Sequence, residues 1–397
     1  MTIAFVDGLI FVGDGRILEH ETVLVDGDRI IKVANGNIPI PKDAIKIPLA
    51  GHTLLPGFID CHVHFCLDGS ADPIGSRMGE PLAITTLKAA QFARQTLMAG
   101  VTSVRDLGGK DGVALSIRDA IQSGLIPGPR MLASGRLICM TGGHGWRSGQ
   151  EADGPDGVRK AAREQIKFGA DLLKFMATGG VLTAGVEPGS EEFTEEELRS
   201  GIQEAHKADK KTAAHAQGTQ GILNALRAGI DSIEHGIYLD EETISLMLKR
   251  DVPLVATLSA LYQIESKGVE AGIPAFVVDK SLRIKPFHLA SVRMAREAGV
   301  RVAMGTDAGT PFNLHGENLG ELQRLVEVGY SPMEALESGT RIAAQVLGLE
   351  NELGTIEEGK LADLIVVKGN PLEDIALMLN AEGIHLVMQG GKLVKGE

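Results

Sequence analysis

The segment GFIDCHVHF, residues 57–65, places two histidines one residue apart within an apolar run. Pro56 and Gly57 mark the start of this run, and its β-branched and aromatic residues favour a β-strand. Alternate side chains of a strand point to the same face, so the imidazoles of His62 and His64 are expected to converge. Taken alone, the H-x-H motif fits two core histidines or a metal-binding pair about equally well. The rest of the sequence has to decide between them.

The composition is that of an ordinary soluble globular protein. The chain has 397 residues, of which 44% are hydrophobic and 23% are charged. No apolar stretch is long enough to span a bilayer, and the N-terminal segment lacks the basic and apolar regions of a signal peptide. The three cysteines are too few for a disulfide framework. We therefore expect a cytoplasmic protein without a membrane partner.

The charge distribution bears on the possible partners. The 39 basic and 52 acidic residues give a formal net charge of -13 at pH 7. Lysine and arginine do not cluster into a stripe of the kind that binds a phosphate backbone. An acidic balance of this size typically keeps the surface solvated. The charge distribution therefore argues against nucleic acid and anionic membranes as partners.

The middle of the chain, residues 56–348, alternates short apolar runs with helical segments. Strand candidates run from FIDCHVHF to RVAMGTD, and each is followed by at least one helix candidate. Repeated βα units predict a parallel sheet, and about eight units in roughly 290 residues predict a closed (β/α)8 TIM barrel. A doubly wound open sheet is the alternative. No G-x-G-x-x-G motif follows the first strand, which disfavours a dinucleotide site.

The two ends of the chain have a different pattern. Residues 1–55 contain short strand candidates separated by Asp-Gly turns, and residues 349–397 contain the strand candidates ADLIVV, HLVMQGG and KLV. Neither end is long enough to bury a good core alone. We therefore predict that 1–55 and 349–397 pair in one small β-sandwich domain beside a barrel domain of residues 56–348.

Polar residues occur at the ends of several predicted strands. Each has an ordinary structural explanation when taken alone, such as a helix cap for an aspartate or a snorkelling side chain for a lysine. Together they occupy the C-terminal ends of the first, fourth, fifth, sixth and eighth strands, which is where barrel enzymes assemble their active sites. These residues are His62, His64, Lys174, His215, His235 and Asp307.

This arrangement resembles the amidohydrolase superfamily of metal-dependent hydrolases. The resemblance covers nearly the whole chain and includes the segments LLPGFIDCHVH, TSVRDLGG, MTGGHG, IEHG, GTDAG and LGTIEEGKLADLIVV. The segments TGGHG and KFMATGG are most similar to the Xaa-Pro dipeptidase (prolidase) and carboxypeptidase-like branch, which is related to imidazolonepropionase. The resemblance implies an enzyme that cleaves an amide or peptide bond.

The resemblance also implies a binuclear metal centre. His62, His64 and Asp307 are expected to bind the more buried of two divalent ions, and His215 and His235 are expected to bind the more exposed one. Nitrogen and oxygen ligands suit zinc best, with manganese, cobalt and iron as alternatives.

Three further roles follow from the same resemblance. Lys174, carboxylated by CO2, is expected to bridge the two ions, because a lysine near cations loses its proton and becomes able to react. A metal-bridging hydroxide is expected to attack the amide carbon, and Asp307 to carry its proton to the leaving nitrogen. His144, in the glycine-rich MTGGHG segment, is the second expected catalytic residue and would bind the substrate carbonyl oxygen.

Substrate-binding candidates lie in loops at the same end of the predicted barrel. Besides His144 they are Tyr238, Arg147 and Tyr262, and His315 is a weaker candidate. Each has a plain alternative as a surface or packing residue. The expected substrate is a small molecule, a dipeptide or an N-acyl amino acid. The protein is expected to be a homo-oligomer, as members of the family commonly are.

Several alternatives remain open in the sequence. A cyclic-amide or heterocycle hydrolase similar to imidazolonepropionase would use the same metal site. A non-catalytic scaffold on the same fold is disfavoured because all of the ligand positions are filled. The acidic segments TAGVEPGSEEFTEEE and GQEADGPDG either select a basic substrate side chain or carry solvated charges at helix N-termini. Arg105 and Asp106, which end the second predicted strand, are expected to form a structural ion pair.

Overall fold

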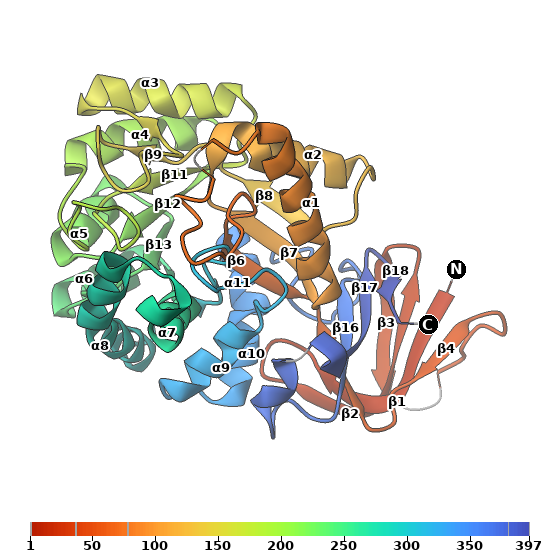
Figure 1. Ribbon diagram of the computed structural model, residues 1–397. Helices are drawn as coiled ribbons and strands as arrows, with labels where there is room; N and C mark the ends of the chain where they lie inside the picture. The colour runs from red at the N-terminus through yellow and green to blue at the C-terminus, as the bar shows by residue number, and fades with distance from the viewer. Residues whose placement is uncertain (1, 36–37, 78, 380, 397) are drawn as a thin grey trace.

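The computed structural model describes residues 2–35, 38–77, 79–379 and 381–396. It has an α/β fold in which parallel strands alternate with helices, as the sequence predicts, and in which a further sheet lies to one side (Figure 1). None of the described helices combines the length and the apolar character that a bilayer span requires.

The parallel strands form two sheets in the described part of the chain. The order of the first sheet is β6-β7-β8, and the order of the second is β10-β9-β11-β12-β13-β14-β15. The strands are β6 (Phe58–Val63), β7 (Val101–Asp106), β8 (Arg130–Ala133), β9 (Ile138–Cys139), β10 (Gln150–Glu151), β11 (Leu172–Met176), β12 (Lys211–Ala216), β13 (Ser232–His235), β14 (Leu254–Val255) and β15 (Val302–Ala303).

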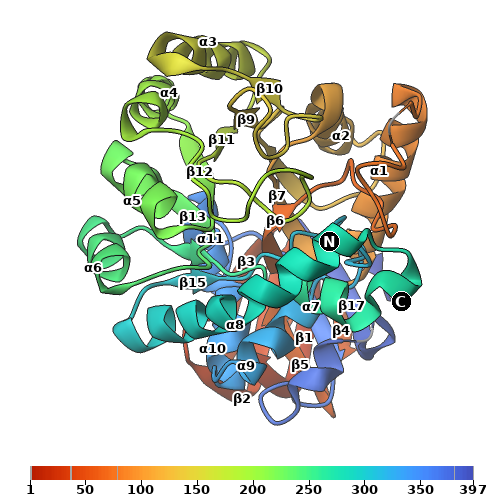
Figure 2. The same ribbon diagram turned by 60° about the vertical axis from the view of Figure 1, so that its left-hand side comes forward.

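Helices follow these strands along the chain and lie outside them (Figure 2). They are α1 (Leu82–Met98), α2 (Val113–Gln122), α3 (Gly154–Lys167), α4 (Glu195–Lys207), α5 (Thr219–Ala228), α6 (Glu241–Arg250), α7 (Leu258–Lys267), α8 (Ala275–Ala298), α9 (Gly320–Glu327), α10 (Pro332–Ser338) and α11 (Arg341–Leu347). Helix α8 is the longest of these and continues through Pro286.

Backbone hydrogen bonds connect the two parallel sheets at both sides. Cys61 N of β6 donates to Met304 O, just after β15, at 3.0 Å. Asp171 N, just before β11, donates to Ala133 O of β8 at 2.9 Å. Because the strands of each sheet run parallel, their C-terminal ends lie at the same edge of the fold. Residues at these ends are therefore brought together.

Strands from the two ends of the chain share one sheet, which has eight strands among the described residues. The order is β18-β17-β16-β5-β1-β2-β3, and β4 pairs with β1. Leu55 and Ile365 are antiparallel partners, and this pairing joins the N-terminal and C-terminal segments. The strands are β1 (Thr2–Phe11), β2 (Ile17–Asp26), β3 (Arg29–Asn35), β4 (Ile45–Pro48), β5 (His52–Pro56), β16 (Leu364–Lys368), β17 (Ile384–Gln389) and β18 (Lys392–Lys395).

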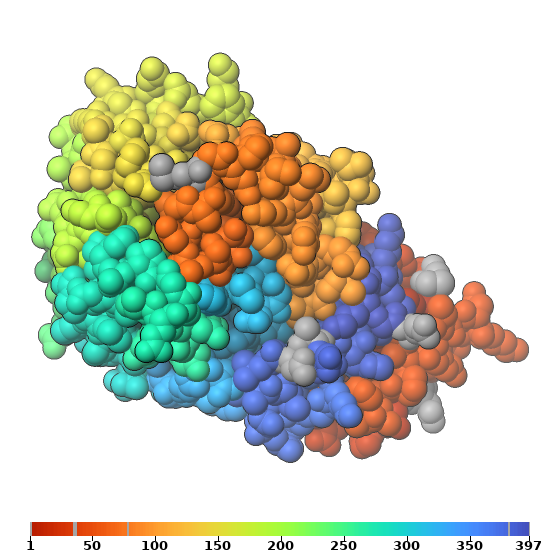
Figure 3. Space-filling model, in the orientation of Figure 1, coloured from red at the N-terminus to blue at the C-terminus, as the bar shows by residue number. Residues whose placement is uncertain are grey.

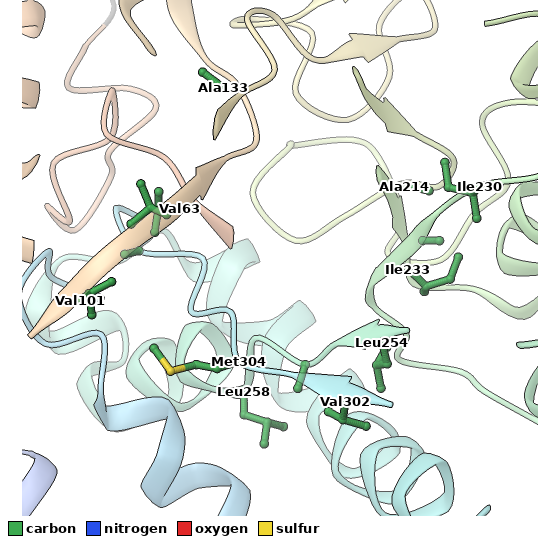
Figure 4. Packing of buried hydrophobic residues seen from close by; sticks show 14 of the residues in the cluster. Val63, Val101, Ala133, Ala214, Ile230, Ile233, Leu254, Leu258, Val302 and Met304 are labelled. Atoms are coloured by element: carbon green, nitrogen blue, oxygen red, sulfur yellow. The ribbon is translucent and has the colours of Figure 1, made fainter. Parts of the chain in front are cut away.

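The largest hydrophobic core lies between the parallel strands and their helices. It includes Val63, Val101, Ile233, Leu254 and Met304, all of which are fully buried (Figure 4). β-Branched residues are frequent in this core because they pack well on a pleated surface. This core fixes the strands whose C-terminal ends carry the predicted site.

Candidate metal centre

The six predicted ligands line one cavity of about 300 Å³ at the C-terminal ends of the parallel strands. Four of the six, His62, Lys174, His215 and His235, are at most 6% exposed, and the side chains of His64 and Asp307 are 12% and 16% exposed. The strands that carry the six residues differ. His62 lies on β6, Lys174 on β11, His215 on β12 and His235 on β13, while His64 follows β6 and Asp307 follows β15. The topology thus gathers residues that lie up to 245 positions apart, from 62 to 307, in the sequence.

The histidine rings form a continuous cluster in this cavity. The ring centroids of His62 and His64 are 5.2 Å apart, those of His62 and His235 are 5.0 Å apart, and those of His215 and His235 are 4.6 Å apart. Ligand-type atoms of His62, His235 and Asp307 all lie within 4.8 Å of one another. Such spacing allows one ion to contact several of these side chains.

His62 has a fixed orientation and tautomer. Its Nδ1 lies 2.9 Å from Oε2 of Glu234, and a carboxylate only accepts hydrogen bonds, so Nδ1–H donates to it. The lone pair of Nε2 is then directed at Oδ1 of Asp307, 3.4 Å away. Two acceptors that face each other at this distance attract a cation between them.

His64 and His235 are oriented in the same way. Nδ1 of His64 donates to Gly108 O at 2.7 Å. Nδ1 of His235 lies 2.6 Å from Oγ1 of Thr257, whose hydroxyl donates to Ala256 O at 2.7 Å and therefore accepts from the imidazole. Both histidines keep an Nε2 lone pair for a metal, and an outer hydrogen bond that fixes a ligating imidazole is typical of metal sites.

The charge states of these groups also suit a metal centre. Burial lowers the pKa values of His62, His215 and His235 well below the ordinary histidine value, so these imidazoles are neutral. Burial would raise the pKa of Asp307, but the neighbouring histidines outweigh it and lower that pKa to about 2. Neutral imidazoles and an ionised carboxylate are the forms that bind metals.

His64 differs from the other histidines in its charge state. Burial is the largest single cause and lowers its pKa, but the hydrogen bond to Asp307, whose Oδ1 is 3.2 Å from Nε2, and the negative charges of Asp307 and Asp106 together give a net upward shift. A proton on this nitrogen therefore competes with a metal ion for the same position.

Lys174 is the least satisfied member of the cluster. Its Nζ is buried and contacts no hydrogen-bond acceptor among the described residues. Burial is the main cause that lowers the pKa of Lys174 to about 8. Because an unpaired buried ammonium is costly, the site favours either a neutral amine or a chemical group that supplies partners to Nζ. The residues present fit a metal centre with oxygen and nitrogen ligands.

A buried hydrogen-bond network holds Glu234, the partner of His62. Glu234 accepts from Nη2 of Arg105 at 2.7 Å and from Oγ of Ser232 at 2.7 Å. Nε of Arg105 in turn donates to Cys61 O at 2.7 Å. The carboxylate that orients His62 is thus held by residues of β6, β7 and β13.

The predicted ion pair between Arg105 and Asp106 is wrong. Arg105 pairs with Glu234, whereas Asp106 accepts from the backbone N–H groups of Phe65 and Gly108, both at 2.9 Å. Adjacent residues of a strand point to opposite faces, which is why the two side chains have different partners. Asp106 instead holds the loop that supplies the carbonyl of Gly108 to His64.

Several residues at the strand ends have left-handed backbone conformations. The φ angles are 71° at His235, 57° at Thr257 and 60° at Asp307. Such conformations are uncommon outside glycine, above all for a β-branched threonine, and persist when surrounding contacts hold them. Here the hydrogen bonds that orient the histidines provide those contacts.

His144 also lines the cavity. Its ring centroid lies 4.5 Å from that of His215, and its backbone N–H donates to Oε1 of Glu192 at 2.7 Å. Nδ1 lies 2.9 Å from Oγ1 of Thr183. Burial lowers the pKa of His144 to about 3. Arg147 lines the same cavity and lies beside the ring of Trp146.

The remaining substrate-binding candidates lie elsewhere. Tyr238 is half-buried, and the ring of Tyr262 lies 3.8 Å from the guanidinium carbon of Arg324. Neither tyrosine is among the described residues that line the cavity. His315 is buried and stacks on Phe92. The substrate-binding roles of these three residues stay predictions.

The acidic loop residues have structural partners outside the cavity. Glu187 pairs with Arg283 at 2.7 Å, and Glu197 forms a capping box with Thr194 at the start of α4. Neither glutamate is among the described cavity residues. The structure therefore favours helix-terminal and surface roles for these charges over selection of a basic side chain.

Three residues that orient the histidines of the cavity, Glu234, Thr183 and Thr257, were not predicted from the sequence. Glu234 directly precedes His235 in a fully buried strand. A carboxylate in such a strand requires a polar or charged partner. The sequence therefore contained a sign that Glu234 binds another polar group. Thr183 and Thr257 lie in segments without a recognisable motif. Their hydrogen bonds to His144 and His235 depend on the tertiary fold.

The chain is similar to several known proteins over most of its length. The amidohydrolase family matches residues 53–394. Ochratoxinase from Aspergillus niger is 34% identical over 422 aligned residues, which cover 98% of this chain and 86% of the relative. An imidazolonepropionase from Alkaliphilus metalliredigens is 21% identical and covers 96% of this chain and 91% of the relative.

Solved structures are similar over the whole chain. A Xaa-Pro dipeptidase with methionine bound in its active site has a TM-score of 0.93 and 35% identity, with 100% of both chains covered. A prolidase complexed with N-methylphosphonate-L-proline has a TM-score of 0.93 and 33% identity, again with 100% of both chains covered.

Replacing Glu234 tests the network behind the centre. We expect Glu234→Gln to weaken zinc binding about 10- to 100-fold, because the amide cannot replace the carboxylate between Arg105 and Nδ1 of His62. Zinc affinity would be measured by competition with a chromophoric chelator, with circular dichroism as a check of folding. Glu242→Gln is the matched control, since this glutamate pairs with Arg227 on the surface. A folded Glu234→Gln variant with unchanged zinc affinity would contradict the role of the network.

Proposed function

The chain belongs to the amidohydrolase family, and we propose that it is a binuclear metal-dependent hydrolase that cleaves a peptide or amide bond in dipeptides or N-acyl amino acids. The observation that carries the proposal is the convergence of neutral imidazoles, the ionised Asp307 and the unpartnered Lys174 in one cavity. The hydrogen bonds on Nδ1 of His62, His64 and His235 leave the Nε2 lone pair of each ring for a metal.

The proposed arrangement holds two divalent ions, with zinc as the first choice. His62, His64 and Asp307 would hold one ion, and His215 and His235 the other. Nε2 of His215 lies 3.4 Å from Gly179 O, which leaves its Nδ1 as the ligand nitrogen. When bound, the ions supply a Lewis acid for a carbonyl oxygen and lower the pKa of a water molecule.

Lys174 is proposed to become a carbamate that bridges the ions. The lone pair of neutral Nζ attacks the carbon of CO2, the N–C bond forms as one C=O π bond breaks and its electron pair moves to oxygen, and one Nζ proton leaves to solvent. The lowered pKa of Lys174, about 8, supports this step because it makes the neutral amine accessible near neutral pH. The carbamate adds two oxygen ligands at a position where Nζ contacts no acceptor among the described residues.

Asp307 is proposed to move the proton. Its carboxylate is ionised and lies 3.2 Å from Nε2 of His64 and 3.4 Å from Nε2 of His62. It takes a proton from the attacking water as the C–O bond forms. It then gives this proton to the leaving nitrogen as the C–N bond breaks, so that an amine and a carboxylic acid are released, and the acid ionises in solvent.

His144 and Arg147 are proposed to orient the substrate. His144 is next to His215 and would bind the carbonyl oxygen on which negative charge develops. Arg147 lines the same cavity, and its guanidinium would attract the carboxylate of a dipeptide or an N-acyl amino acid.

The side of the cavity formed around α7 and α8 supports a preference for apolar substrate side chains. Leu261, Ile264, Pro274 and Phe276 line the cavity there. Figure 3 shows this region, in teal, beside the segment that follows β6, in orange. An apolar wall of this kind stabilises an apolar side chain by removing it from water.

We also infer that the parallel strands close into a (β/α)8 barrel, and that residues 1–55 and 349–397 form a small β-sandwich domain. The hydrogen bonds on both sides of the parallel sheets and the pairing of β5 with β16 support these inferences. The cytoplasmic location and the homo-oligomeric state stay predictions from the sequence.

The experiment that tests the function is a substrate library. Zinc-loaded protein would be mixed with dipeptides and N-acyl amino acids that differ in the C-terminal residue, and amino-acid release would be measured together with zinc content. We expect release from substrates with apolar C-terminal side chains at about two zinc ions per chain. Zinc binding with cleavage of cyclic amides alone would favour the imidazolonepropionase-like alternative and overturn the proposal.

Removing Lys174 should abolish activity. Lys174→Ala deletes the proposed bridge, so we expect loss of turnover and of bound zinc, with partial recovery when a short carboxylic acid is added in high bicarbonate. Activity and zinc content would be measured on the same samples. Lys160→Ala is the control because Lys160 is exposed on α3. A Lys174→Ala variant that keeps both zinc and activity would contradict the bridging role.

Changing Asp307 should separate metal binding from turnover. Asp307→Asn keeps an oxygen ligand but cannot accept the proton, so we expect substantial zinc and a fall in kcat of about 10²- to 10⁴-fold. Zinc content and kcat would be compared with those of the unmodified protein. Near-normal kcat would remove Asp307 as the proton carrier.

A further inference from the structure

Thr183 is the hydrogen-bond partner of Nδ1 of His144. Thr183 lies in the segment between β11 and α4 and is half-buried. Its Oγ1 is 2.9 Å from Nδ1 of His144 and also accepts the backbone N–H of Gly145 at 3.2 Å. One threonine hydroxyl therefore contacts both a ring nitrogen and the backbone of the glycine-rich loop.

The donors and acceptors around the hydroxyl allow it to donate to Nδ1 of His144. A hydroxyl has one hydrogen to donate and two lone pairs that accept. One lone pair of Thr183 Oγ1 accepts from Gly145. Among the described residues, Nδ1 of His144 is the one acceptor that this hydroxyl contacts. The hydroxyl keeps its one hydrogen to donate to Nδ1, and in that direction of the hydrogen bond the ring hydrogen lies on Nε2.

We propose that Thr183 is a positioning residue that holds His144 as the Nε2–H tautomer, so that Nε2 donates a hydrogen bond to the carbonyl oxygen of the substrate. This inference rests on the proposed amide hydrolysis. The opposite tautomer would direct a lone pair at the same oxygen and would repel it. A donor that is fixed before the reaction needs no reorganisation when the oxygen becomes negative.

The position of the ring is fixed as well as its tautomer. An ideal Cβ on Gly180 would lie 2.5 Å from Nε2 of His144, so a larger residue at position 180 would displace the ring. On the other side, the ring packs against His215 with centroids 4.5 Å apart. The Nε2–H group is thus held beside a proposed metal ligand.

The segment that carries Thr183 is anchored from α8. Nζ of Lys280 donates to Thr183 O at 2.7 Å and also to Val186 O. Lys280 is only 7% exposed, so these carbonyls satisfy a buried ammonium. The loop of His144 is anchored separately, because its backbone N–H donates to Glu192. Both partners of the Thr183–His144 hydrogen bond are therefore held in place.

Two substitutions of Thr183 test the effect on catalysis. Thr183→Val has nearly the same shape without the hydroxyl, and we expect kcat to fall about tenfold or more while KM and zinc content change little, since loss of one oxyanion donor costs about 10²- to 10³-fold. Thr183→Ser restores the hydroxyl and should recover kcat to within about threefold of the unmodified protein. Thr2→Val, in the sheet formed by the chain ends, is the control. Unchanged kcat in Thr183→Val would overturn the proposal.

The tautomer can be observed without any turnover. In zinc-loaded protein labelled with ¹⁵N-histidine, the signals of His144 are assigned by their loss in His144→Gln. We expect Nε2 to be protonated and Nδ1 to accept, and we expect Thr183→Val but not Thr183→Ser to change this pattern. An Nδ1–H tautomer in the unmodified protein would overturn the proposal. The expected tautomer in a protein that cleaves no amide would support the assignment by Thr183 and count against the proposed function alone.

Discussion

The hydrogen bond between Nδ1 of His62 and Glu234 is the interaction on which the arrangement of the site depends. It gives the imidazole one tautomer and one orientation, and it directs Nε2 at Asp307. Arg105 holds Glu234 and also bonds to the backbone of Cys61, so the three strands β6, β7 and β13 are tied together at this point. Because all of these groups are buried, a missing partner would leave an uncompensated charge in the interior.

Hydrogen bonds orient other histidines of the cavity as well. His64 and His235 are oriented by a carbonyl and by a threonine hydroxyl, and His144 is oriented by Thr183. Left-handed backbone conformations at His235 and Asp307 turn these residues toward the cavity at the strand ends. Backbone geometry and outer hydrogen bonds therefore arrange the candidate ligands, and this form of support is typical of metal sites.

The positions of the metal-ligand candidates could be predicted from the sequence because they follow from regular structure. Strand periodicity puts His62 and His64 together, and parallel pairing brings the strand ends that carry Lys174 and His215 to one edge. The same periodicity argues against a pair between Arg105 and Asp106, although the pair was predicted. The partners of His62 and His144 could not be predicted, since Glu234 and Thr183 reach them only through tertiary contacts. The contacts of loop candidates such as Tyr262 could not be predicted for the same reason, because loop conformation depends on packing with distant elements.

The most direct test is anomalous diffraction at the zinc edge from crystals of zinc-loaded protein grown in the presence of bicarbonate. The account predicts two anomalous peaks in the cavity, one beside His62, His64 and Asp307 and one beside His215 and His235. It also predicts electron density for a carboxylate on Nζ of Lys174 between the peaks. A single peak with an unmodified Lys174, or no peak beside these histidines, would contradict the binuclear centre.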